Sequence, residues 1–264
     1  MLFDRGPAHV ILQDAESGRC AASGERTGTG MPMTAKKIRV FTWSLDLPES
    51  DAVDFMSQLS SDEHQRARRL VKKEDALHFM AARAGLRMIL GAEIGESPRD
   101  VTFQLSPSGK PRLANHGDMH FNLSHSSGHA VLVLSRQQPV GIDIERIRTL
   151  ASGIETQFLS SEEIARLTHV PASARTASLV ALWAAKEAVI KLYGDSRQLK
   201  PGDIDLNLDG TGQITSARVA GEVGCTLTSL DASPGFACML AHSQPLDASE
   251  TVVARWQGLR ASRT

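Results

Sequence analysis

The stretch VGIDIERI at residues 140–147 has the bulk of a β-strand but carries two acids inside it. Successive side chains of a strand point to opposite faces, so Ile142 and Ile144 are predicted to face one side. Asp143 and Glu145 then face the other, about 7 Å apart along the strand. Such a like-charged pair is explained either by a solvent-exposed edge strand or by a cation that binds both carboxylates.

A helix is predicted further along, in TASLVALWAAKEAVIKLYG at 176–194, with Gly194 as its stop. Trp183, Glu187 and Lys191 follow one another at four-residue intervals and therefore share a face of this helix. A surface ion pair between Glu187 and Lys191 is one interpretation. The apolar bulk around the pair favours partial burial instead, which makes Glu187 a candidate third carboxylate for a Mg²⁺ site with the two strand acids.

Two polar segments are candidates for phosphate binding. NLSHSSGHA lies between two predicted strands within 119–135, and we interpret Ser124–Gly128 as a polar loop that offers hydroxyls, an imidazole and backbone N–H groups. A Ser124–His125 nucleophile pair is the competing interpretation, but neighbouring strand residues face opposite ways. SGKPRL forms a predicted turn in which Lys110 stands between Gly109 and Pro111 as a rigid platform for a charged ligand.

A cluster of cations occupies the segment HQRARRLVKK, and it consists of Arg66, Arg68, Arg69, Lys72 and Lys73. A solvated helix face is the simplest interpretation of this basic cluster. A surface for phosphate or for an acidic partner is the alternative.

The order strand, helices, strands occurs twice along the chain. We therefore predict two similar α+β units, 36–138 and 139–246, although they share no obvious sequence repeat. Residues 1–35 are rich in Gly, Ser, Ala and Thr and are expected to be a disordered leader, and 247–264 a surface tail. Within the first unit, 60–95 is predicted to hold two helices, the first capped by Ser60 or Ser61 and the second ending at Gly91.

Composition narrows the class of protein. The 264 residues carry a formal net charge of -1, which does not indicate a globally basic nucleic-acid binder. Three scattered cysteines make a disulfide framework or a structural zinc site improbable. No apolar run approaches the ~18 residues needed to cross a membrane, and the N-terminus lacks a secretory signal, so a reducing cytoplasm is the expected location.

Three motifs together resemble a known family. FNLSHS at 121–126, GIDIE at 141–145 and WAAKEAVIK at 183–191 are similar, in content and order, to the signature of Sfp-type 4′-phosphopantetheinyl transferases, which are holo-[acyl-carrier-protein] synthase-like enzymes. GKP at 109–111 and the basic run at 66–75 also resemble that family. The resemblance implies a pseudo-twofold α+β fold of two subdomains, each a small antiparallel sheet packed with helices, and usually a monomer.

The resemblance also implies a reaction, the Mg²⁺-dependent transfer of 4′-phosphopantetheine from coenzyme A to a serine of an apo carrier protein in fatty-acid, polyketide or nonribosomal-peptide synthesis. The implied Mg²⁺ ligands are Asp143, Glu145 and Glu187, and the implied catalytic residues are Glu187 and Lys191. The implied coenzyme A contacts are Arg68, Lys73, Gly109, Lys110, Pro111, Ser124, His125, Lys186 and Lys191.

Partners and alternatives follow from the same resemblance. An acidic carrier protein is expected to dock on a local patch of Arg66, Arg69 and Lys72, and neither nucleic acid nor membrane is an expected partner. A non-catalytic coenzyme A or nucleotide-binding module and a Mg²⁺-dependent phosphohydrolase remain as alternative functions.

Overall fold

A computed structural model describes residues 38–107, 109–194, 199–219, 222–244 and 251–256. The predicted leader at 1–35 lies outside these residues. Within the described ranges, no helix is both long and apolar enough to cross a membrane.

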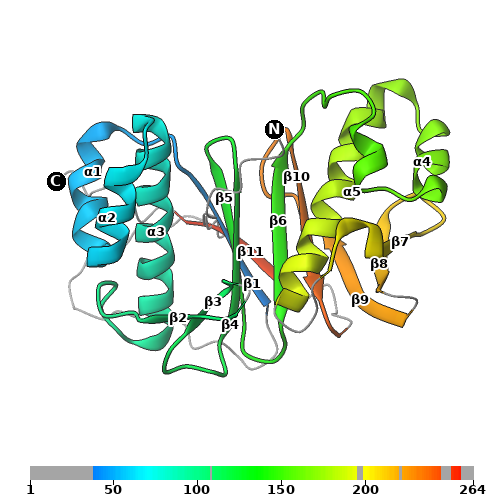
Figure 1. Ribbon diagram of the computed structural model, residues 1–264. Coiled ribbons are helices and arrows are strands. Elements are labelled where there is room, and N and C mark those ends of the chain that lie inside the picture. The colour runs from blue at the N-terminus through cyan, green and yellow to red at the C-terminus, as the bar shows by residue number, and fades with distance from the viewer. Residues whose placement is uncertain (1–37, 108, 195–198, 220–221, 245–250, 257–264) are drawn as a thin grey trace, which may run out of the picture.

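The N-terminal half builds a four-stranded sheet in the order β11-β1-β5-β4, with helices on one side (Figure 1). β11 runs parallel to β1, while β5 is antiparallel to both β1 and β4. A short hairpin of β2 and β3 stands apart as its own two-stranded sheet. The elements are β1 (Ile38–Ser44), η1 (Glu49–Asp51), α1 (Ala52–Gln58), α2 (Ser61–Arg69), α3 (Lys73–Ile94), β2 (Phe103–Leu105), β3 (Pro111–Leu113), β4 (His120–Ser126), β5 (His129–Ser135) and β11 (Thr251–Arg255).

The C-terminal half builds a five-stranded antiparallel sheet in the order β6-β10-β9-β8-β7. Helices α4 and α5 lie on its outer side, so the two sheets face each other between two helical layers (Figure 1). The elements are β6 (Val140–Arg146), η2 (Ile154–Gln157), α4 (Ser161–Thr168), α5 (Ala172–Tyr193), η4 (Pro201–Asp203), β7 (Ile204–Leu208), β8 (Ile214–Val219), β9 (Glu222–Ser229) and β10 (Phe236–His242). The predicted α+β architecture is confirmed.

The apolar core between the two sheets fixes which way β6 faces. Ile142 and Ile144 are buried there against residues of β1 and β5, so the alternation of the strand turns Asp143 and Glu145 toward α5. Gly141 allows α5 to come close, because a Cβ at that position would lie 2.2 Å from the carbonyl oxygen of Ala188. The sequence pattern of the opening stretch therefore sets both the sheet packing and the direction of the acids.

A short repeat, LSSDE at 59–63 and LSSEE at 159–163, forms the same helix start in both halves. In each copy the first serine and the last glutamate form a capping box, on α2 and on α4. Each glutamate also accepts a bond from a cation on the 22-residue helix of its own half. The two halves thus share a short repeat that was not predicted, in which four of five residues are identical.

Both glutamates are buried and their carboxylates are fully engaged. Glu63 accepts bonds from Arg83 Nε at 2.5 Å and Arg87 Nε at 2.6 Å. Burial alone would raise the pKa of Glu63, but the charge of Arg83, a backbone bond from Ser60 and the charge of Arg87 outweigh it and lower the pKa. Glu163 accepts a bond from Lys186 Nζ at 2.8 Å.

The cations that bind these glutamates, Arg87 and Lys186, also donate hydrogen bonds to backbone carbonyl oxygens. Arg87 Nη1 donates to the carbonyl oxygens of Pro98 and Val101, both at 2.9 Å. Lys186 Nζ donates to those of Pro201 and Ile204, at 3.1 and 2.8 Å. Each long helix is thereby tied to the segment that leads into a following strand, and polar groups that would be costly unpaired are satisfied.

Two local expectations are corrected by the structure, and one helix was not predicted. Helix α3 runs on to Ile94 and ends at Gly95, which adopts a left-handed conformation with φ of 75°. Helix α1, with the single buried residue Phe55, has too short a pattern to be predicted. The predicted tail at 247–264 holds strand β11, which pairs with the edge of β1. After it, the Trp256 ring packs 5.4 Å from that of Trp43.

We predict that Glu163→Gln lowers the free energy of unfolding by about 3–5 kcal/mol, because the fully buried Lys186 ammonium loses its counter-charge. Urea unfolding followed by circular dichroism measures this cost. The matched control is Glu162→Gln, whose side chain is 76% exposed in a surface pair with Arg166. Equal stability of the two variants would contradict the prediction.

Candidate active site

Strands β4 and β6 belong to different sheets, and side chains of β4 accept hydrogen bonds from the backbone of β6. Asn122 Oδ1 accepts the backbone N–H of Ile142 at 2.8 Å. Ser126 Oγ accepts that of Arg146 at 3.2 Å, and a longer contact of 3.4 Å runs from the N–H of Ile144 to Ser124 Oγ. Alternate side chains of β4 therefore take the place of backbone acceptors, and we name this set the β4–β6 ladder.

Asp143 lies at the centre of the ladder and is 3% exposed. Its Oδ1 accepts bonds from Ser124 Oγ at 2.6 Å and Lys191 Nζ at 2.5 Å. Lys191 also donates to Ser124 Oγ at 2.8 Å. Within the described part of the chain, Asp143 Oδ2 is buried and has no hydrogen-bond partner. A buried carboxylate oxygen without a donor is the kind of atom that a cation satisfies.

Glu145 is held at both of its oxygens. Ser126 Oγ donates to Oε2 at 2.9 Å, and Trp183 Nε1 donates to Oε1 at 3.3 Å. The pKa of Glu145 is raised to about 7. Burial and then the charge of Asp143 raise it, and the hydrogen bonds from Ser126 and Trp183 and the charge of Lys191 offset part of that rise. The predicted repulsion between Asp143 and Glu145 is therefore one cause of the raised pKa of Glu145.

Glu187 stands on the face of α5 that looks at β6. One turn before it, Trp183 reaches Glu145, and one turn after it, Lys191 reaches Asp143, so the predicted shared helix face is confirmed. The oxygens of the three acids do not all lie within 4.8 Å of one another, a spacing that only Asp46, Glu74 and His78 meet among the described residues. The predicted Mg²⁺ ligand set of Asp143, Glu145 and Glu187 therefore stays a prediction.

His125 lies in strand β4, where the sequence predicted a loop. The turn is only Ser127–Gly128, with φ of 45° and 73°, so the strand continues to Ser126. Burial, together with the charges of Lys191 and His78, lowers the pKa of His125 to about 3, so the imidazole is neutral at physiological pH. Its predicted contact with a coenzyme A phosphate stays a prediction.

Lys110 lies against the end of α5. Its Nζ donates to the carbonyl oxygen of Lys191 at 2.6 Å, which satisfies a carbonyl of the last helical turn. The GKP turn thus joins the N-terminal half to the helix that carries Glu187 and Lys191. Its predicted contact with the adenine of coenzyme A stays a prediction, as does that of Gly109 and Pro111.

The basic cluster, Arg68 and Lys73 included, is exposed on α2 and at the start of α3. His78, one and a half turns further along α3, is near enough to His125 to affect its pKa. The predicted contact of Arg68 and Lys73 with the 3′-phosphate of coenzyme A stays a prediction.

Two residues predicted to contact coenzyme A are buried, and their contact with it stays a prediction. Lys186 is 0% exposed, and its ammonium is held by Glu163 and two carbonyl oxygens on the far side of α5. Ser124 is 2% exposed, and its hydroxyl is held by Asp143, Lys191 and the ladder. The sequence pattern did not indicate how deeply these two side chains are buried. Ser126 and Trp183, which hold Glu145, were not among the predicted site residues.

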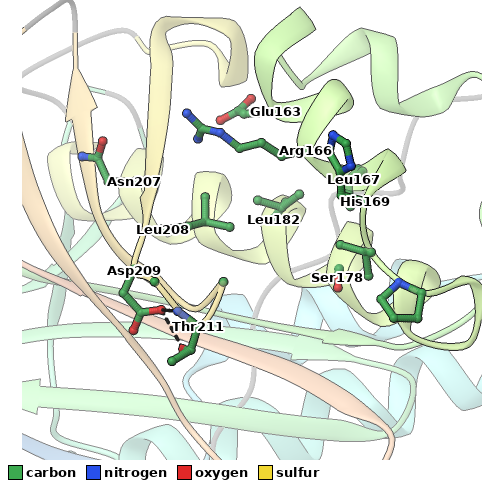
Figure 2. A pocket seen from close by; sticks show the side chains of 14 residues that line it. Glu163, Arg166, Leu167, His169, Ser178, Leu182, Asn207, Leu208, Asp209 and Thr211 are labelled. Atoms are coloured by element: carbon green, nitrogen blue, oxygen red, sulfur yellow. Dashed lines mark hydrogen bonds between the residues drawn. The ribbon is translucent and has the colours of Figure 1, made fainter.

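A separate cavity of about 720 Å³ lies in the C-terminal half, between α4, the start of α5 and the β7–β8 turn (Figure 2). Leu167, Leu182 and Leu208 give it an apolar lining, and Arg166 and His169 stand at its side. No predicted site residue lines this cavity, so it is distinct from the group around β6.

Two cysteines of the described chain, Cys225 and Cys238, are buried and form no disulfide.

Two family models cover most of the chain in succession. Residues 42–137 match the model described as 4′-phosphopantetheinyl transferase, N-terminal. Residues 139–241 match that of the 4′-phosphopantetheinyl transferase superfamily. Together these ranges include β4, β6 and α5, and so every residue of the group around Asp143.

Curated relatives are similar over long stretches. The chain is 27% identical over 210 residues to 4′-phosphopantetheinyl transferase Sfp of Bacillus subtilis (strain 168), covering 79% of this chain and 93% of that protein. It is 33% identical over 171 residues to 4′-phosphopantetheinyl transferase HetI of Nostoc sp., covering 62% of this chain and 72% of that protein. A solved apo-ACPS structure from Chronobacterium ammoiniagenes is 23% identical, covers 40% of this chain and 96% of its own, and has a TM-score of 0.30.

We predict that stability depends on the protonation of Glu145. Because folding raises the pKa of this carboxyl from an ordinary 4.5 to about 7, the folded state holds the proton more tightly than the unfolded state. The contribution of Glu145 to stability, measured as the difference between wild type and Glu145→Gln, should therefore fall as pH rises from about 4.5 to about 7 and then level off. Urea unfolding without divalent cations should show that Glu145→Gln loses this slope and that Glu162→Gln keeps it. A slope unchanged in Glu145→Gln would contradict the prediction.

Proposed function

The chain belongs to the 4′-phosphopantetheinyl transferase superfamily, and we propose that it transfers the 4′-phosphopantetheine group of coenzyme A to a serine hydroxyl of an apo carrier protein. The transfer depends on Mg²⁺ and releases 3′,5′-ADP. The observation that carries this proposal is the pair Asp143 and Glu145, both turned toward Lys191 and Glu187, with one buried Asp143 oxygen that lacks a donor.

The residues present fit a hard divalent cation. Mg²⁺ prefers oxygen ligands, usually a few carboxylates with waters and phosphate oxygens completing the shell. Asp143 Oδ2 is the leading ligand, since a cation there supplies the missing partner of a buried charged group. Glu145 and Glu187 complete the proposed set. When bound, Mg²⁺ acts as a Lewis acid that neutralises charge on the pyrophosphate of coenzyme A.

The chain's own side chains supply the remaining tasks. In the transfer, the serine oxygen of the carrier forms a bond to the β-phosphorus of coenzyme A, and the bond from that phosphorus to 3′,5′-ADP breaks. Lys191 holds a positive charge beside the oxygen that departs with the ADP. Glu187 accepts the serine proton. Phosphoryl transfer needs positioning and charge neutralisation more than covalent help, and no internal nucleophile is required.

Two phosphate contacts are proposed from the N-terminal half. His125 is neutral and donates one hydrogen bond to a coenzyme A phosphate, while Arg68 and Lys73 supply the positive charge for the 3′-phosphate. This division follows from the low pKa of His125 and from the exposure of the two cations. Neutral and charged donors differ about twofold in hydrogen-bond strength.

We propose that an acidic carrier protein docks on the patch of Arg66, Arg69 and Lys72, all three of which are exposed. Arg69 and Lys72 are exposed, and Val71 between them is 100% exposed. An apolar side chain in full contact with water beside two cations suits a partner that combines carboxylates with an apolar patch. The cations speed the encounter and the valine adds buried area on contact.

We predict that wild-type protein, coenzyme A, Mg²⁺ and an apo carrier give a carrier heavier by one phosphopantetheine group in mass spectrometry. Asp143→Asn should lower the rate at least 10²-fold, since it removes a ligand charge, and Glu187→Gln should do so by removing ligand charge and proton acceptor together. Asp205→Asn, an exposed acid on β7, is the control and should match wild type.

The same experiment separates the alternative functions. Phosphate release without a heavier carrier would support a phosphohydrolase. Binding of coenzyme A with neither product would support a non-catalytic module. Near wild-type transfer by Glu187→Gln would count against both proposed roles of that side chain.

We predict that the double charge reversal Arg69→Glu with Lys72→Glu weakens the apparent affinity for the carrier ten- to a hundredfold at low salt and far less at high salt. Turnover at saturating carrier should be close to wild type, since neither residue belongs to the proposed catalytic set. Steady-state kinetics over a salt series measures both effects. Arg218→Glu, an exposed cation on β8, is the control, and an equal loss in that variant would argue against a specific docking surface.

A further inference from the structure

Glu145 is held differently from Asp143, although both belong to the same strand. Both donors to Asp143, Ser124 and Lys191, bind a single oxygen, Oδ1. The donors to Glu145 bind one oxygen each, Ser126 at Oε2 and Trp183 at Oε1. A carboxylate oxygen has two acceptor sites, so each oxygen of Glu145 keeps one for a further partner. The carboxylate is therefore fixed in orientation without being used up.

The hydroxyl of Ser126 has a determined direction. Its oxygen accepts the backbone N–H of Arg146 at 3.2 Å, while its own proton goes to Glu145 Oε2 at 2.9 Å. Ser126 ends β4, in the N-terminal half, and Glu145 lies on β6, in the C-terminal half. One residue of the first half thus aims a carboxylate of the second.

The indole of Trp183 is also fixed in place. Its ring meets the ring of Phe158 edge to face, with centroids 4.9 Å apart and an interplanar angle of 74°. Its Nε1–H points at Glu145 Oε1. Packing on one side and a hydrogen bond on the other leave the indole little freedom, so the second donor is as well oriented as the first.

We propose that Ser126 and Trp183 are positioning residues that hold Glu145 in the orientation in which it binds the cation. This inference rests on the proposed function, since it takes the cation site as given. Neither residue touches the cation or the reacting atoms. Loss of an outer hydrogen bond that orients a metal ligand typically costs 10–100-fold in metal affinity.

The test measures binding of Mn²⁺ alone, without coenzyme A or carrier, by the loss of the free-ion paramagnetic resonance signal. Ser126→Ala removes one donor, and Ser126→Thr retains the hydroxyl. Trp183→Phe keeps an aromatic ring and loses the N–H. Each variant has a matched control. Ser216→Ala, on β8, loses the hydrogen bond that Asn207 of β7 donates to the serine hydroxyl. Trp43→Phe loses an indole N–H that has no partner within the described residues.

We expect Ser126→Ala and Trp183→Phe each to weaken Mn²⁺ binding about tenfold, with Ser126→Thr close to wild type and both controls unchanged. Saturating Mn²⁺ should restore most of the turnover, because the site is misaligned and not removed. Wild-type affinity in Ser126→Ala and Trp183→Phe would overturn the inference, as would an equal loss in Trp43→Phe. A loss of thermal stability with unchanged Mn²⁺ affinity would assign the pair a structural role and overturn it too.

The two levels of inference fail separately. If wild-type protein binds no Mn²⁺, or if Asp143→Asn binds it as well as wild type, the cation site itself is wrong and the proposed function falls with it. If Asp143→Asn abolishes binding while Ser126→Ala and Trp183→Phe do not weaken it, the cation site stands and only the positioning roles fail.

Discussion

The β4–β6 ladder is the constraint on which the site depends. Two strands of different sheets meet, and the backbone N–H groups of β6 at the seam are satisfied by side chains of β4 in place of backbone carbonyls. Serine and asparagine suit this task because each can accept such a bond and still donate another. Two of the spare donor groups go to Asp143 and Glu145. The bonds that join the halves are therefore the bonds that orient the acids.

Much of this arrangement was predictable because it follows from periodicity. Alternation along VGIDIE put both acids on one face, and four-residue spacing put Trp183, Glu187 and Lys191 on another that looks at them. The capped helices after Ser60 and Ser160 also follow from local chemistry. These features depend on neighbours within a few residues, and such neighbours are visible in a sequence.

Depth and distant pairing were not predictable in the same way. Lys186 has the composition of a phosphate ligand, but its partner Glu163 stands 23 residues earlier and faces the opposite side of α5. Ser124 looked like part of a loop, because nothing local reveals that a two-residue turn lets β4 run on beside β6. The match between β4 and β6 is a tertiary register, so the roles of Ser126 and Trp183 became visible only once the halves were placed together.

Strand β11 completes the first sheet only after the second sheet has been made along the chain. The polypeptide builds the N-terminal sheet, then the whole C-terminal sheet, and only then returns to pair with β1. During synthesis on the ribosome, the outer edge of β1 therefore waits without its parallel neighbour until β11 is made, after all the other strands. An exposed strand edge invites pairing with other chains. The edge of β1 is thus open to association even after the other strands of both sheets have been synthesised.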